Sequence, residues 1–269
     1  MKPYDLFVST FVIGCISLTL VNQNARAVAI DNNRSLQQSE PMPQLLAQTT
    51  QATSQDQILN TINSLTPTQQ QQITSIFQSS QPAIDQKTDQ LQTALTALMQ
   101  SLTPTTPAST ISAAHQKVIS IAQQRNQLYF NRLLKIREVL TVQQRSQLNQ
   151  AVRALNSYSQ PDSDQIDVLV STATSLTPAQ TQQITQIVNN DQPAIDRKTQ
   201  QLQAALQSFD RSLQPNTPAS AISTAHSQVI DTAIQRNKLY FDRLLKIREV
   251  LTVEQRTQIN QAINALASL

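Results

Sequence analysis

The sequence predicts an all-α protein made of two tandem units of related sequence. The chain of 269 residues has one glycine, no tryptophan and twelve prolines. Its body is rich in alanine, leucine and glutamine, which favour helices. Without glycine the chain is poorly suited to β-hairpin turns and to phosphate-binding loops. The second observation is a duplication, because the string RLLKIREVLTV stands at 132–142 and again at 243–253.

The duplication extends over a whole domain-sized unit. Residues 65–155 align without a gap with residues 176–266, and about two thirds of the aligned residues are identical. A repeat of this length indicates tandem copies of one structural unit. We therefore predict a first unit at 55–155 (unit 1), a linker at 156–164 and a second unit at 165–269 (unit 2).

The first 54 residues are predicted to lie outside these units. Residues 1–27 resemble a secretory signal peptide, with Lys2, an apolar run and Ala-Arg-Ala before the cleavage point. A lipid anchor at Cys15 is the less favoured alternative, because apolar residues follow that cysteine. Residues 28–54 are polar without a sustained hydrophobic period, which predicts a disordered leader. The sequence thus predicts an exported protein.

Four Leu-Thr-x-x-Gln segments mark predicted helix starts. In each segment the threonine is the expected N-cap and the glutamine closes a capping box, worth roughly 1 kcal/mol. The leucines lack the apolar partner of a hydrophobic staple, since Gln70 and Arg145 occupy that position, and we expect the leucines to point into the core. The motif residues are Leu65, Thr66, Gln69, Leu140, Thr141, Gln144, Leu176, Thr177, Gln180, Leu251, Thr252 and Gln255.

Each unit is expected to contain four helices, one of them long. In unit 1 the first helix begins at the first box and ends before Pro82, which opens the second. The segment Thr-Pro-Ala-Ser at 106–109 is expected to cap a third helix of about 34 residues, or roughly 50 Å. The fourth helix begins at Thr141. A short amphipathic lead-in precedes each unit's first box.

This arrangement of boxes around a long helix, behind a secretory signal, resembles the Spy/CpxP family of periplasmic proteins. The resemblance covers nearly all of residues 56–266. It implies an all-α fold in which two hairpin protomers pair antiparallel into a thin curved cradle. Because the unit is duplicated in this chain, we hypothesise that its two Spy-like units form the cradle within one chain. Whether two chains associate further stays open.

The resemblance also implies a class of function. Members include ATP-independent chaperones for unfolded envelope proteins, a stress adaptor that damps a sensor kinase, and metal-responsive relatives. The leading hypothesis for this chain is a periplasmic chaperone-like protein that binds unfolded or stress-damaged envelope proteins. The alternatives are an adaptor that docks on the periplasmic domain of a sensor kinase, or a metal-responsive relative.

The helix before the second box is apolar around most of its circumference, which indicates burial on more than one side. One interpretation is that one face fills its own bundle while the other meets the sister unit. The other is that the surplus apolar surface and its flanking cations bind non-native clients. The candidate client-binding residues are Arg125, Tyr129, Phe130, Arg132, Lys135, Arg236, Tyr240, Phe241, Arg243 and Lys246.

The sequence offers no sign of catalysis, cofactors or metal binding. The body of the chain contains no nucleophile motif, so we expect that the protein is not an enzyme and binds no cofactor. His115 and His226 are the only histidines, and their neighbours supply no carboxylate, so half-buried or solvated imidazoles are expected rather than metal ligands. Residues 54–160 carry a net charge of +4 and residues 161–269 one of −1. Without a dense basic run, nucleic acid is not an expected partner.

Overall fold

The computed structural model describes residues 62, 65–156 and 176–267, and within these ranges the chain is helical without strands. Unit 1 contains α3 (Pro67–Ser101), α4 (Ala108–Val139) and α5 (Val142–Asn156). Unit 2 contains α7 (Pro178–Ser212), α8 (Ala219–Val250) and α9 (Val253–Ala267). The predicted all-α fold with two repeated units is confirmed. The predicted signal peptide, leader and linker lie outside the described residues.

The predicted helix break at Pro82 is wrong. α3 runs without interruption through Pro82, and α7 runs likewise through Pro193. A proline inside a helix costs about 3 kcal/mol, because it removes a backbone N–H and clashes with the preceding turn. Continuous packing offsets this cost, since Ile73 and Ile84, on either side of the proline, are both buried. The described part of each unit therefore holds two long helices and one short one.

The predicted start of the third helix also needs correction. The N-cap of α4 is Pro107, which makes no side-chain capping bond. Thr106 instead belongs to the preceding turn, where its backbone N–H donates to the carbonyl of Thr103 at 3.3 Å. The predicted length is nearly right: α4 has 32 residues, or about 48 Å at 1.5 Å per residue.

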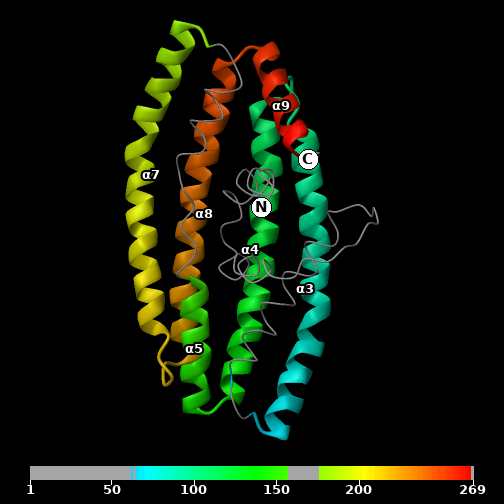
Figure 1. The fold of residues 1–269 in the computed structure, drawn as a ribbon, viewed down its shortest axis with the longest axis vertical. Coiled ribbons are helices and arrows are strands. Elements are labelled where there is room, and N and C mark those ends of the chain that lie inside the picture. Colours follow the sequence, from blue (N-terminus) through cyan, green and yellow to red (C-terminus); the bar gives the residue numbers. More distant parts are fainter. Residues whose placement is uncertain (1–61, 63–64, 157–175, 268–269) are drawn as a thin grey trace, which may run out of the picture.

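The four long helices lie side by side in the order α7, α8, α4, α3, as Figure 1 shows. Each unit contributes one helical hairpin, and α4 packs against α8 where the hairpins meet. The short helices lie at opposite ends of this row: α5 is near the α7–α8 turn and α9 near the α3–α4 turn. The side chain of Asn149 in α5 donates to the carbonyl of Leu213 at 3.1 Å, and Asn260 in α9 donates to the carbonyl of Leu102. Each short helix thus contacts the other unit's turn.

The core is shared between the units. Phe241 of unit 2 is 3% exposed and packs in a cluster of unit 1 residues that includes Ile111 and Val118. Phe130 of unit 1 is 8% exposed and packs in the matching cluster of unit 2, beside Phe209. Each hairpin therefore completes its hydrophobic core with a phenylalanine from the other.

Replacing Pro82 by alanine should raise the free energy of unfolding by about 1–3 kcal/mol, because it restores a backbone N–H within a continuous helix. Pro82 is exposed, so the change leaves no cavity. Urea unfolding followed by circular dichroism measures the difference. Pro67→Ala is the control, because Pro67 occupies the first turn, where a proline costs nothing. Equal stability of Pro82→Ala and the parent chain would contradict this account of α3.

Candidate functional site

The two Leu-Thr-x-x-Gln boxes of each unit meet in space. In unit 1 the capping box of Thr66 and Gln69 is complete, and Thr141 and Gln144 make the same bonds at the start of α5. The two glutamines then bond each other: Nε2 of Gln69 donates to Oε1 of Gln144 at 2.8 Å, and the return bond is 3.3 Å long. Nε2 of Gln69 also donates to the carbonyl of Val139 at 3.1 Å. The motif therefore ties the start of α3 to the α4–α5 junction.

Unit 2 repeats this arrangement. Thr177 and Gln180 form a complete capping box, and Thr252 with Gln255 caps α9. The reciprocal bonds between Gln180 and Gln255 are 2.7 and 3.1 Å long. The capping prediction is thus confirmed in all four boxes, whereas the pairing between boxes was not predicted. Of the motif leucines, Leu140 and Leu251 are buried, and Leu65 and Leu176 are half-buried.

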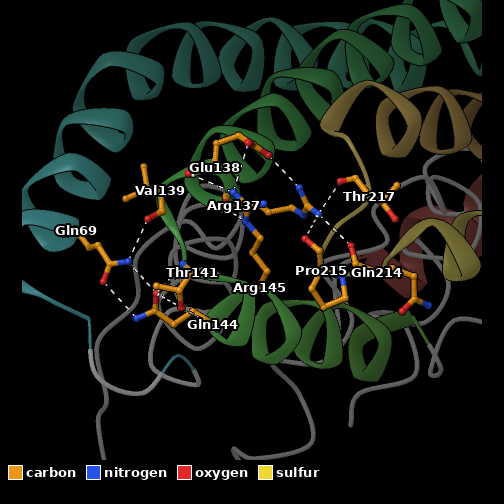
Figure 2. Close-up of polar contacts among 10 residues, drawn as sticks. All are labelled: Gln69, Arg137, Glu138, Val139, Thr141, Gln144, Arg145, Gln214, Pro215 and Thr217. Atoms are coloured by element: carbon orange, nitrogen blue, oxygen red, sulfur yellow. Dashed lines mark hydrogen bonds and ion pairs between the residues drawn. The ribbon is translucent and has the colours of Figure 1, made fainter.

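An arginine beside the α4–α5 junction of unit 1 binds backbone carbonyls of unit 2. Arg137 is 2% exposed, and its Nη2 donates to the carbonyls of Gln214, Pro215 and Thr217 at 3.0, 2.9 and 2.8 Å. These carbonyls lie in the turn after α7, where helix ends leave backbone acceptors without partners. Figure 2 shows Arg137 reaching this turn, while its Nη1 donates to Glu138 at 2.9 Å. One buried cation therefore caps the end of a helix hairpin in the other unit.

The contact is reciprocal. Arg248, which is the equivalent of Arg137, donates through Nη2 to the carbonyls of Thr103, Pro104 and Thr106 at 2.7, 3.2 and 2.9 Å. These three residues are the unit 1 equivalents of the turn residues that Arg137 contacts. When residue i meets residue j and the equivalents of both meet again, the two units are related by a two-fold axis. The units of this chain therefore pair as a symmetric dimer does, within one polypeptide.

Two histidine–phenylalanine stacks line the seam between α4 and α8. The ring of His115 stacks on Phe241 at 3.6 Å between centroids, and His226 stacks on Phe130 at the same distance. Both histidines are buried, with exposed fractions of 2% and 7%. The prediction of half-buried or solvated imidazoles is therefore wrong, because each imidazole is covered by a phenylalanine of the other unit.

Burial keeps both imidazoles neutral. Desolvation by burial is the main cause that lowers the pKa of His115 from 6.5 to about 4. The nearby charge of Asp242 raises this pKa, and the charge of Lys238 lowers it. Desolvation by burial alone lowers the pKa of His226 from 6.5 to about 4. Nδ1 of His226 is buried without a hydrogen-bond partner among the described atoms, so nothing there stabilises a second ring proton. The seam thus depends on uncharged histidine.

Half of the candidate client-binding residues are interior. The structure buries Phe130 and Phe241 in the seam and leaves Arg132 only 2% exposed. The guanidinium of Arg132 lies 4.9 Å from the centre of the Phe77 ring and bonds Gln81 at 2.8 Å. These contacts support packing within the bundle and against the sister unit, the first of the two interpretations of this helix. The five buried candidates are Arg125, Phe130, Arg132, Phe241 and Arg243.

The other five candidates reach the surface to different extents. Tyr129, Arg236 and Tyr240 are half-buried, whereas Lys135 and Lys246 are exposed. Arg236 lies over the Tyr240 ring at 5.1 Å. Lys246 forms an ion pair with Asp191 at 2.8 Å. Of the ten candidates only the two lysines are exposed, and Lys246 already pairs with Asp191.

The described residues contain no group of three or more histidine, cysteine, aspartate or glutamate side chains placed to hold a metal ion. Among the same residues, no helix combines the length and the apolar character needed to cross a bilayer.

Comparison with known families identifies the motif. The sequence profile of the LTXXQ motif family matches residues 50–152 and again residues 170–262. These two matches span well over half of the chain. The protein belongs to the LTXXQ motif family. The resemblance to the Spy/CpxP proteins is thereby confirmed, and the double match agrees with a tandem duplication of the family's unit. Searches among curated proteins and among solved structures returned no match.

Stability should fall in mild acid because of the two histidines. With pKa values of about 4 in the folded chain and 6.5 when unfolded, the unfolded chain binds more protons between these pH values. The stabilisation that each neutral histidine contributes is complete above pH 6.5 and is lost as the pH falls towards 4, a loss of about 3 kcal/mol for each histidine. Urea unfolding at several pH values measures the slope.

Carboxylates titrate in the same range, so the test compares slopes between variants. His115→Phe and His226→Phe should each reduce the pH dependence between 6.5 and 4, and the double variant should reduce it most. A slope unchanged in the double variant would show that these imidazoles are not buried as described.

Proposed function

We propose that this protein is an ATP-independent, chaperone-like binder of unfolded or stress-damaged envelope proteins in the periplasm. Spy/CpxP-type members of the family are periplasmic and are not known enzymes. The observation that carries the proposal is the paired architecture: two family hairpins are joined antiparallel, with reciprocal contacts by Arg137 and Arg248. This is the assembly that the resemblance implies for two separate protomers. Here one chain supplies both halves.

The surface supports weak and polar contacts. Among the described residues, the exposed large hydrophobic side chains are Val142 and Val253, at 53% and 47%. Glutamine, threonine and charged side chains occupy most other exposed positions of the helices. Contacts of this kind favour fast and reversible association with many partners over tight binding to one. Such a surface suits a protein that holds unfolded clients without an energy source.

Lysine contacts are expected to differ between the units. Lys246 is paired with Asp191, whereas Ser80 occupies the position equivalent to Asp191 in unit 1. Lys135 is exposed and has no carboxylate at that position. Its ammonium group is therefore the better candidate for contact with acidic segments of a client.

The test is suppression of aggregation by residues 28–269 without ATP. Light scattering from several unrelated clients, diluted from denaturant, should fall at near-stoichiometric ratios and rise again at high salt. Lys135→Ala should raise the ratio needed for half suppression by about twofold, as expected for one solvated charge contact. Lys246→Ala is the matched control and should have less effect, because Asp191 already engages that lysine.

Two results would contradict the proposal. A folded, helical chain that suppresses the aggregation of no client would exclude chaperone-like binding. Saturable binding to the periplasmic domain of one sensor kinase, without suppression, would favour the adaptor instead.

A further inference from the structure

The end of unit 1 at which its two Leu-Thr-x-x-Gln boxes meet, called the box end below, is a closed hydrophobic cluster. Ile73 of α3 and Leu148 of α5 are 5% and 1% exposed there, and Ile136 and Leu140 of the α4 end pack with them. The cluster is completed by Ile62, from the segment that precedes the first box, which is 5% exposed. An isoleucine from outside the hairpin thus covers this end of unit 1.

The same end of unit 2 is incompletely covered. Ile184 and Ile259, the equivalents of Ile73 and Leu148, are half-buried rather than buried. The motif glutamines differ in the same way: Gln69 and Gln144 of unit 1 are buried, whereas their unit 2 equivalents are half-buried. The core beneath still forms, because Ile247 is buried as its unit 1 equivalent is. The difference is therefore confined to the outer layer of this end.

Two substitutions between the repeats remove the covering side chains. The position equivalent to Ile62 is Ala173, which lies outside the described residues, and the position equivalent to Phe77 is Val188. In unit 1 the Phe77 ring also contacts the guanidinium of Arg132 at 4.9 Å. In unit 2 the corresponding Arg243 lies over Tyr240 alone among the described rings. Unit 2 therefore lacks the side chain of an isoleucine and most of a phenyl ring.

The geometry points to a binding site for a short aliphatic segment at the box end of unit 2. We propose that Ile184, Ile187, Val188 and Ile259 receive an isoleucine or leucine of an unfolded client, in the place that Ile62 takes in unit 1. The inference rests on the proposed function, because an unfolded client is what offers such a segment. It adds the chemistry of the recognised segment and the place where it binds.

The charges around the site favour an aliphatic and weakly charged segment. Lys246 and Asp191 form an ion pair at 2.8 Å on the neighbouring helix turns, so their charges offset each other. Arg243 is directed to Gln192, whose Oε1 accepts from it at 2.8 Å. The apolar side chains of the site are aliphatic, as is the isoleucine that fills the equivalent place. A segment that presents an isoleucine or leucine fits these neighbours.

The probe is a fluorescein-labelled peptide with the sequence of residues 56–65, DQILNTINSL, which supplies the covering isoleucine in unit 1. Fluorescence anisotropy with residues 28–269 should show saturable binding of one peptide per chain. Ile184→Gln and Ile259→Gln should each weaken binding by about tenfold, because each places an amide in an apolar contact. Val142→Gln is the matched control, since it changes an exposed valine of unit 1, and should leave the affinity unchanged.

A second variant keeps the test valid if the glutamine variants unfold. Val188→Phe gives unit 2 the ring that packs against the cluster of Ile62 in unit 1, so it should raise the affinity for the peptide. A control peptide with both isoleucines replaced by aspartate should not bind. Binding that survives both Ile184→Gln and Ile259→Gln, an affinity that Val188→Phe does not change, or binding of two peptides per chain would overturn the proposal.

Aggregation suppression measured with the same variants separates the two proposals. If the chain suppresses aggregation but the peptide does not bind, clients bind elsewhere and the site is excluded. If the peptide binds at unit 2 and no client is protected, the chaperone-like function is excluded and the aliphatic site stands.

Discussion

The structure depends on two arginines, Arg137 buried and Arg248 half-buried, that act across the seam between the units. Arg137 and Arg248 each hold three backbone carbonyls of the other unit's turn. Hydrogen bonds from a charged donor are worth about 1.5–3 kcal/mol, and a buried guanidinium without partners is costly. Between these bonds α4 packs against α8, and two histidine–phenylalanine stacks line their contact. Each arginine thus finds its three carbonyl acceptors in the other unit.

The duplicated units keep this shared seam but differ at their outer ends. The arginines, the stacked rings and the motif glutamines are the same residues in both repeats. A change in one arginine or glutamine would remove the hydrogen bonds of its partner. At the box end, only unit 1 has the covering Ile62 and Phe77. A single chain can vary one half of a symmetric assembly without changing the other, which a homodimer cannot do. Duplication thus permits one half to stay closed while the other binds a partner.

The local features of the fold could be predicted from the sequence, and the contacts between units could not. Thr66 with Gln69 specifies a helix start through bonds within four residues, so its capping was predictable. Pro82 is locally a helix breaker, but packing of residues on both sides overrides that preference. His115 lies near no carboxylate in sequence, and its stacking on Phe241 arises only from the tertiary arrangement. The sequence leaves open whether the arginines of the candidate client surface are packed or exposed, because their aromatic and amide partners lie on other helices.

The most direct test of the paired architecture is a cross-link over the seam. The side chain of Gln123 in α4 donates to Asp231 in α8 at 3.3 Å on the surface, and residues 28–269 contain no native cysteine. Gln123→Cys/Asp231→Cys, treated with a short bismaleimide at low protein concentration, should give an intrachain cross-link whose yield is independent of concentration, detected by peptide mass spectrometry. The single variants serve as controls. Cross-links found only between chains, or none in the folded protein, would contradict pairing of the two units within one polypeptide.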